Sequence, residues 1–401
     1  MTDETPPKPG SAGQAFLVGE TLYIRGAEEG DANRAPGWRF LPFPIPSERA
    51  EKILKEELPP LIERGKQTVI ACRISDDAIV GSAQIEGEDW RTAEVRLHAD
   101  PALGPAAAAA IKVELLRLIV PWLSDERHTM VVHLDLDADE TPVVEAATAI
   151  GMRQAYRLRE AFWRDGGWHD QITFELPHPA WVTRLGDPGA GIDGALPLGI
   201  VPTSPAASPF PRPDAAVPAN AIMVGDRLVL RPLETADAEQ IARWSREETE
   251  TFFQNGRSVR SQAGIAHWFR KMNESEPPED FEFAIALRDG GELIGDNGLF
   301  GLNLIDRNAE TGTFIYRKEY RGGGYGTEAK HLLLDYAFNR LGLHMVYSWV
   351  LIENTRSAAA LRKQGYRDAG RLNWVTTRPG EFGAFLVFDL LADEWRASRQ
   401  R

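Results

Sequence analysis

Apolar residues recur along the chain with two spacings, and each spacing predicts a different kind of element. Short apolar runs such as "TVIACRI" and "FEFAIAL" predict strands. Longer segments place apolar residues three and four positions apart, and this spacing predicts a helix from about Tyr325 to Leu341. The order of these elements predicts a mixed α/β fold with antiparallel hairpins and one strand–helix–strand crossover.

The pattern of elements occurs twice. The segment "LVGETLYIRGAEEGDA", which begins at Leu17, aligns without a gap with "MVGDRLVLRPLETADA", which begins at Met223. The predicted strands and helices that follow these segments also come in the same order. We therefore predict two copies of one fold, over residues 14–180 and 221–401, joined by a Pro/Ala/Gly-rich linker over residues 181–220.

Composition restricts the class of protein only loosely. The chain has 401 residues, of which 43% are hydrophobic and 26% charged, and its formal net charge is −14. This acidic balance argues against a nucleic-acid partner and is compatible with a positively charged one. The single cysteine, Cys72, excludes an intrachain disulfide. The N-terminus does not resemble a signal peptide, and the most apolar helical run is too short and too charged to span a membrane. We expect a cytoplasmic protein with no membrane partner and no metal.

A glycine-rich turn precedes the helix that begins near Tyr325. The stretch "RGGGYGTEA" covers residues 321–329 and follows a predicted strand. Helix N-termini present unpaired N–H groups and a partial positive charge, and glycines let these groups approach a ligand, so the turn predicts a phosphate site. Its spacing matches neither a Walker loop nor the dinucleotide fingerprint. A flexible turn that contacts only water is the alternative interpretation.

The turn and its surroundings resemble a known family. The spacing Arg321-x-x-Gly324-x-Gly326, between such a strand and such a helix, resembles the acyl-CoA signature of the GNAT superfamily of N-acetyltransferases. Together with "RLVLRPLETADAEQIARW" and "IENTRSAAALRKQGY", it is most similar to the branch that includes ribosomal-protein N-terminal acetyltransferases. The resemblance implies two tandem GNAT-like domains, each a mixed, mostly antiparallel sheet flanked by helices, with a splayed central strand pair.

The resemblance also implies acetyl-CoA as co-substrate and assigns residues to it. Amides of the glycine turn would hold the pyrophosphate, Thr327 would offer a hydroxyl, and pantetheine would bind main-chain groups between two splayed parallel strands. The residues expected to contact CoA are Phe314, Tyr316, Arg321, Gly322, Gly324, Tyr325, Gly326, Thr327, Asn354 and Ser357.

Acetyl transfer requires a group that removes a proton from the amine and a group that stabilises the leaving thiolate. The resemblance makes Glu310 the candidate base, directly or through water, although a surface strand carboxylate is the alternative. Glu94 stands at the same place in the first half, so a structural role could explain both residues. Ser357 is the candidate donor to the leaving sulfur. Asn354 is a third candidate catalytic residue, and it is equally well explained as a helix N-cap.

The acceptor is expected near two acidic segments, "REETETFFQNGRS" and "ESEPPEDFE". Their acidic residues would attract a cationic amine and their aromatic residues would form a wall, although a solvated run of charges is the alternative. The candidates are Glu247, Glu248, Glu250, Phe252 and Phe253, with Trp374 as a further wall or core residue.

The first half departs from the pattern at the glycine turn. It has "HADPALGPAAAAA" where the second half has "KEYRGGGYGTEAK", so that only Gly104 is kept. Pro101 and Pro105 have no N–H to offer a phosphate. We therefore expect a degenerate copy that keeps the fold, has lost acetyl-CoA binding or binds it poorly, and supplies scaffold or part of the acceptor cleft.

These observations predict an N-acetyltransferase that moves an acetyl group from acetyl-CoA to a primary amine by direct attack in a ternary complex, with its active site in the second half. A non-catalytic acyl-CoA sensor or interaction module is one alternative. An enzyme that acetylates a small amine, such as an antibiotic, instead of a protein N-terminus is another. A homodimer is the candidate assembly.

Overall fold

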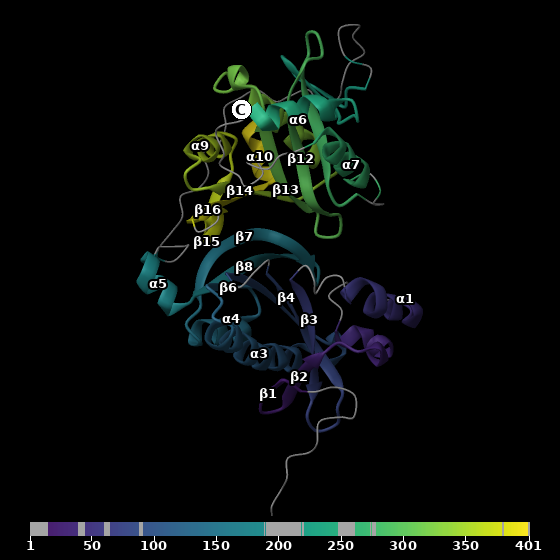
Figure 1. Ribbon diagram of the computed structural model, residues 1–401, viewed down its shortest axis with the longest axis vertical. Coiled ribbons are helices and arrows are strands. Elements are labelled where there is room, and N and C mark those ends of the chain that lie inside the picture. The colour runs from purple at the N-terminus through teal and green to yellow at the C-terminus, as the bar shows by residue number, and fades with distance from the viewer. Residues whose placement is uncertain are drawn as a thin grey trace, which may run out of the picture. The chain divides into compact units, whose positions relative to one another are not determined.

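The computed structural model describes residues 15–38, 45–59, 65–87, 91–187, 189, 218, 220–247, 261–272, 274, 278–378 and 381–399. The chain forms two compact units, residues 1–155 with 171–191 and residues 156–170 with 192–401. Each is a sheet covered by helices (Figure 1). The predicted domains divide the chain at other positions, and their bounds stay a proposal.

The sheet of the second unit has the strand order β9-β10-β11-β12-β13-β14-β16-β15. Its neighbours pair antiparallel except β13 and β14, which are parallel. The strands are β9 (Met223–Val224), β10 (Leu228–Pro232), β11 (Phe281–Leu287), β12 (Leu293–Asn303), β13 (Asn308–Ile315), β14 (Met345–Leu351), β15 (Arg367–Arg378) and β16 (Glu381–Leu391). Part of β7 (Arg153–Arg164) belongs to this unit as well, and Tyr156 pairs with Gly370 of β15.

The sheet of the first unit repeats this order as β1-β2-β3-β4-β5-β6-β8. Here β5 and β6 are the parallel neighbours and the other pairs are antiparallel. The strands are β1 (Leu17–Val18), β2 (Leu22–Gly26), β3 (Lys66–Arg73), β4 (Ile79–Glu86), β5 (Thr92–Ala99), β6 (Val131–Asp137) and β8 (Gly167–Pro177). The predicted mixed, mostly antiparallel architecture is confirmed.

Helices pack on both faces of each sheet, because alternate strand residues point to opposite faces. In the second unit α8 (Tyr325–Asp335), α9 (Thr355–Lys363) and α10 (Ala392–Arg399) share a core with Leu228 and Ile285, and α6 (Asp237–Glu247) and α7 (Gln262–Met272) share one with Ala284. In the first unit α3 (Pro105–Pro121) and α4 (Thr141–Ala149) pack against Ile24, whereas α1 (Ser47–Lys52) packs against Tyr23.

Residues that align between the two copies form the same contacts. Arg25 makes a bidentate pair with Asp31 at 2.7 and 2.8 Å, and Arg231 makes one with Asp237 at 2.8 Å. Each pair is largely buried, with its arginine in β2 or β10 and its aspartate after the strand. Each aspartate also accepts a hydrogen bond from the backbone N–H of the residue three positions earlier in the chain. These contacts explain why the arginine and the aspartate recur at the same spacing in both segments.

The two parallel strand pairs differ in length. Pairing between β13 and β14 ends at Glu310 and Tyr347, after which the strands diverge. Pairing between β5 and β6 continues past Glu94 to Arg96. The predicted splayed pair is therefore present in the second unit, while the first unit stays paired two residues further along the strand.

Most of the predicted linker lies outside the described residues. Its first residues, 181–185, belong to α5 (Pro179–Leu185). Within the described part of the chain, no helix combines the length and the apolar character needed to cross a membrane.

Candidate active site

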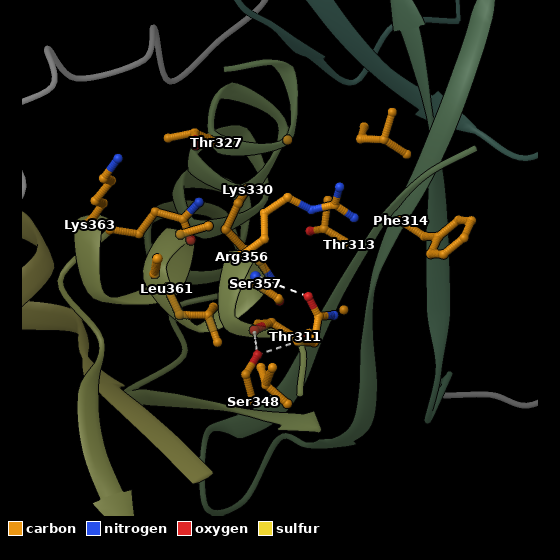
Figure 2. A pocket seen from close by; sticks show the side chains of 18 of the residues that line it. Thr311, Thr313, Phe314, Thr327, Lys330, Ser348, Arg356, Ser357, Leu361 and Lys363 are labelled. Atoms are coloured by element: carbon orange, nitrogen blue, oxygen red, sulfur yellow. Dashed lines mark hydrogen bonds between the residues drawn. The ribbon is translucent and has the colours of Figure 1, made fainter. Parts of the chain in front are cut away.

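A cleft of about 520 Å³ lies in the second unit where β13 and β14 diverge (Figure 2). Residues 310–315 of β13 and residues 348–350 of β14 line it, together with the N-terminal parts of α8 and α9. Diverging strands leave main-chain groups without strand partners, and helix N-termini leave N–H groups without partners. The cleft therefore suits an elongated ligand with a negatively charged end.

The glycine turn forms one edge of this cleft. Gly322 and Gly324 have φ values of +85° and +84°, a conformation that glycine adopts readily. Among the described residues we find no protein acceptor for the amides of residues 322–327, and the first helical hydrogen bond runs from the N–H of Glu328 to the carbonyl of Gly324 at 3.0 Å. The amides at the start of α8 are thus left to bind an anion.

Two charged side chains fix the position of the turn. Arg321 donates from Nε to the carbonyl of Ile315 at 2.8 Å and from Nη2 to that of Tyr316 at 3.0 Å, which ties the turn to the end of β13. Glu328 accepts from the N–H of Arg227 at 2.7 Å and that of Leu228 at 3.1 Å, which ties α8 to β10. Arg321 therefore positions the turn through its main-chain contacts.

Glu310 combines a cleft position with an unusual protonation range. It is the last residue of β13 that pairs with β14, and it lines the cleft. Burial raises the pKa of Glu310 to about 7, the charge of Lys330 opposes this rise, and the charge of Asp280 adds to it. A carboxyl group that loses its proton near neutral pH is suited to general base catalysis.

Asn354 and Ser357 meet at the start of α9. Oδ1 of Asn354 accepts from the N–H of Ser357 at 3.2 Å, so the asparagine is the N-cap of this helix. Ser357 lines the cleft. Tyr366 lies in the core, where its hydroxyl is 2.8 Å from Oγ1 of Thr311 and burial raises its pKa. Ser357 therefore lines the cleft, whereas Tyr366 is fully buried and does not.

The cleft brings together most of the residues predicted from the sequence. They are Glu310, Phe314, Arg321, Gly322, Gly324, Gly326, Thr327, Asn354 and Ser357. Tyr316 is not among them, because β13 ends at Ile315 and the N–H of Tyr316 donates to the carbonyl of Ile294 at 3.0 Å. The side chain of Tyr325 does not line the cleft either, since its ring packs against the guanidinium of Arg227, whose Cζ lies 4.1 Å from the ring centroid.

The predicted acceptor residues are mostly outside the described residues. Glu248, Glu250, Phe252 and Phe253 fall there, and Glu247 is exposed at the end of α6. Trp374 is 4% exposed on β15 and belongs to the core.

Three cations that line the cleft were missed by the sequence analysis. Arg356 and Lys363 come from α9, and Lys330 comes from α8, one turn after Gly326. Lys330 is 4% exposed, and burial lowers its pKa to about 7 against the opposing effect of Glu310. One signal was available: helical spacing puts this lysine on the same face as the core residues Leu334 and Ala337.

The corresponding turn of the first unit uses its own amides. The N–H of Ala102 donates to Oδ1 of Asp100 at 2.9 Å, that of Leu103 to the carbonyl of Asp100 at 3.1 Å, and that of Gly104 to the carbonyl of Pro101 at 3.4 Å. Pro105 then opens α3 without an N–H. These groups are not offered to a phosphate.

Comparisons with known proteins agree with this geometry. Residues 227–367 match the family model described as an acetyltransferase (GNAT) domain. YjcK of Bacillus subtilis, whose name describes an N-acetyltransferase, is 31% identical over 37% of this chain and 85% of its own length. YdaF of the same species, whose name describes a ribosomal N-acetyltransferase, is 27% identical over 44% of this chain and 97% of its own. A spermidine N(1)-acetyltransferase of Vibrio cholerae is 27% identical over 37% of this chain and 84% of its own.

Proposed function

The chain belongs to the GNAT family of acetyltransferases, and from this premise we propose that its second unit moves an acetyl group from acetyl-CoA to a primary amine by direct attack in a ternary complex. The observation that carries the proposal is the row of amides at residues 322–327. These amides have no protein acceptor among the described residues, and they border a cleft that also holds Glu310.

The turn fits the charged part of acetyl-CoA. Its amides and the positive end of α8 would hold the pyrophosphate, and Thr327 adds a hydroxyl at the same edge. Main-chain groups of β13 near Phe314, which have no partner strand on the β14 side, would bind the pantetheine arm. Arg321 holds the turn against the end of β13.

Glu310 accepts a proton from the acceptor, and Ser357 stabilises the leaving sulfur. Glu310 takes a proton from the ammonium group of the acceptor, and the resulting amine forms the new C–N bond at the thioester carbonyl. The C–S bond breaks, and the leaving sulfur, which accepts a hydrogen bond from the Ser357 hydroxyl, takes the second proton of the amine nitrogen and leaves as the CoA thiol. Asn354 acts by capping α9 and so fixing where Ser357 stands.

The class of amine that the enzyme acetylates can be found by screening acceptors one at a time. Relatives of this chain carry names of both a ribosomal and a spermidine N-acetyltransferase, so both a protein N-terminus and a small polyamine belong in the test. The full chain is incubated with acetyl-CoA and one amine at a time: peptides with a free N-terminus, spermidine, an aminoglycoside, and the N-terminally blocked peptide as control. Release of free CoA thiol that depends on the amine supports the proposal.

A non-catalytic acyl-CoA-binding protein is the rival interpretation. It predicts acetyl-CoA binding in calorimetry without amine-dependent thiol release from any acceptor. A chain that binds no acetyl-CoA would overturn the assignment of the cleft itself.

A further inference from the structure

Lys330 is a buried cation that the proposed reaction has not used. Its side chain is 4% exposed and lines the same cleft as Glu310. Among the described residues, neither side chain has a hydrogen-bond or ion-pair partner. A lysine side chain without such a partner is costly to remove from water, so its place deep in the wall of the cleft calls for an explanation.

The charges around Glu310 come from few elements. Lys330 on α8 and Asp280, which precedes β11, act on it with opposite signs. Arg321, and Arg356 and Lys363 on α9, also line the cleft, and the residues that β14 contributes, Ser348, Trp349 and Val350, carry no charge. Of the cations in the cleft wall, Lys330 is the one that is buried and coupled to Glu310.

We infer that Lys330 is a positioning residue for acetyl transfer: its ammonium group keeps the Glu310 carboxylate ionised inside the buried cleft, so that the carboxylate can accept a proton from the acceptor. This inference rests on the proposed function. It assigns Lys330 no contact with the acetyl group. Its effect reaches the reaction through Glu310, as an opposite charge in a medium of low dielectric constant.

The proton balance follows from this arrangement. Near pH 7, in the state that starts the reaction, Glu310 is a carboxylate and Lys330 an ammonium, so the pair carries no net charge. When Glu310 takes the proton of the acceptor ammonium, the pair becomes positive and the acceptor becomes a neutral nucleophile. The proton leaves to solvent after the acetylated product and CoA thiol have formed.

The first test measures Glu310 in the full chain without any substrate. Carbon-13 NMR of protein labelled at glutamate Cδ follows the carboxyl titration, and E310Q identifies the signal. We expect K330M to move the Glu310 titration to higher pH by about one unit or more. K330R keeps the positive charge, so Glu310 in this variant should titrate at or below its wild-type pH. In K330Q, a second neutral variant, the titration of Glu310 should shift as it does in K330M.

Two control variants frame this shift. D280N removes the charge that opposes ionisation and should move the titration of Glu310 to lower pH. K363M removes a cation from the same cleft, at an exposed position that does not act on Glu310, and should leave the titration in place. An unchanged Glu310 titration in K330M and K330Q, or equal shifts in K330M and K363M, would overturn the inference.

The second test uses the reaction. The acid limb of the kcat/KM profile reports the ionisation of the free enzyme. In K330M this limb should move to higher pH together with the NMR titration of Glu310. Below the shifted pKa, kcat/KM should fall about tenfold for each pH unit. K330R should restore the wild-type limb. If no amine is acetylated, the proposed function fails while the NMR result still decides the role of Lys330. A K330M profile that only scales down, without a shift, contradicts the inference.

Discussion

Burial gives Glu310 a protonation range that an exposed glutamate does not have. With its pKa raised to about 7, the carboxylate that accepts a proton becomes available as the pH rises through neutrality. We expect kcat/KM to rise through about pH 7, and E310Q to lower it by about 10²–10⁴-fold. Steady-state kinetics over a range of about pH 5.5–9, which spans the pKa of Glu310, measure both effects. Acetyl-CoA affinity in E310Q serves as the control and should stay within about twofold of wild type.

Gly324 is required by both conformation and space. Its φ is +84°, and a Cβ there would approach Nη2 of Arg227 at 3.3 Å. G324V should lower the free energy of unfolding by about 1–2 kcal/mol and weaken acetyl-CoA binding at least about tenfold, because the turn amides must move.

Gly290 provides the matched control for this prediction. It has a φ of +82° in the turn between β11 and β12, and no atom lies within 4 Å of its added Cβ. G290V should show the same backbone cost with normal acetyl-CoA affinity. Equal loss of affinity in both variants would mean that the defect is general and not a property of the turn.

The lowered pKa of Lys330 also predicts how stability depends on pH. The unfolded lysine titrates at about 10.4 and the folded one at about 7, so between these values the unfolded chain binds more protons. The free energy of unfolding contributed by this group therefore rises as the pH increases from 7 to 10. K330M should remove that rise, which urea titrations at several pH values can measure. A K330M curve with the wild-type slope would contradict the lowered pKa of Lys330 in the folded chain.

At the scale of elements, one glutamate in each copy ties a helix to the second strand of its sheet. Glu328 accepts from the amides of Arg227 and Leu228, and Glu114 accepts from those of Thr21, at 2.8 Å, and Leu22, at 3.2 Å. Since each variant removes the acceptor of two backbone hydrogen bonds, E328A and E114A should each lower the free energy of unfolding by about 1–3 kcal/mol. Only E328A should also weaken acetyl-CoA binding, because α8 carries the turn.

Chemical denaturation and calorimetry on both variants check this contrast. Weakened acetyl-CoA binding in E114A would show that the effect is not confined to α8, and would contradict the contrast.

Local patterns predicted the elements well and their ends less well. The helix expected from about Tyr325 to Leu341 is α8 together with a π-helical turn over Tyr336–Arg340. The place where β13 and β14 part could not be predicted, because side chains and helices packed above the sheet set it, and apolar spacing along either strand does not record them.

At the scale of the whole molecule, the two copies should differ in what they bind. In the first unit the turn amides of residues 102–104 have protein acceptors and the parallel strands stay paired to Arg96. We expect calorimetry of the full chain to give one acetyl-CoA per chain, and G324V to abolish that single event. A stoichiometry of two, or residual tight binding in G324V, would place a working site in the first unit.

The sequence by itself determined the repeated order of elements, the glycine turn, its family resemblance and the candidate base, because each depends on short spacings along the chain. Only the tertiary structure decided that Tyr316 turns its N–H to β12, that Asn354 is engaged as a cap, and that Lys330 is buried in the wall of the same cleft as Glu310. These facts depend on which backbone groups are already paired and how deeply a charge is buried. Both are set by contacts between segments distant in sequence, which local spacing does not encode.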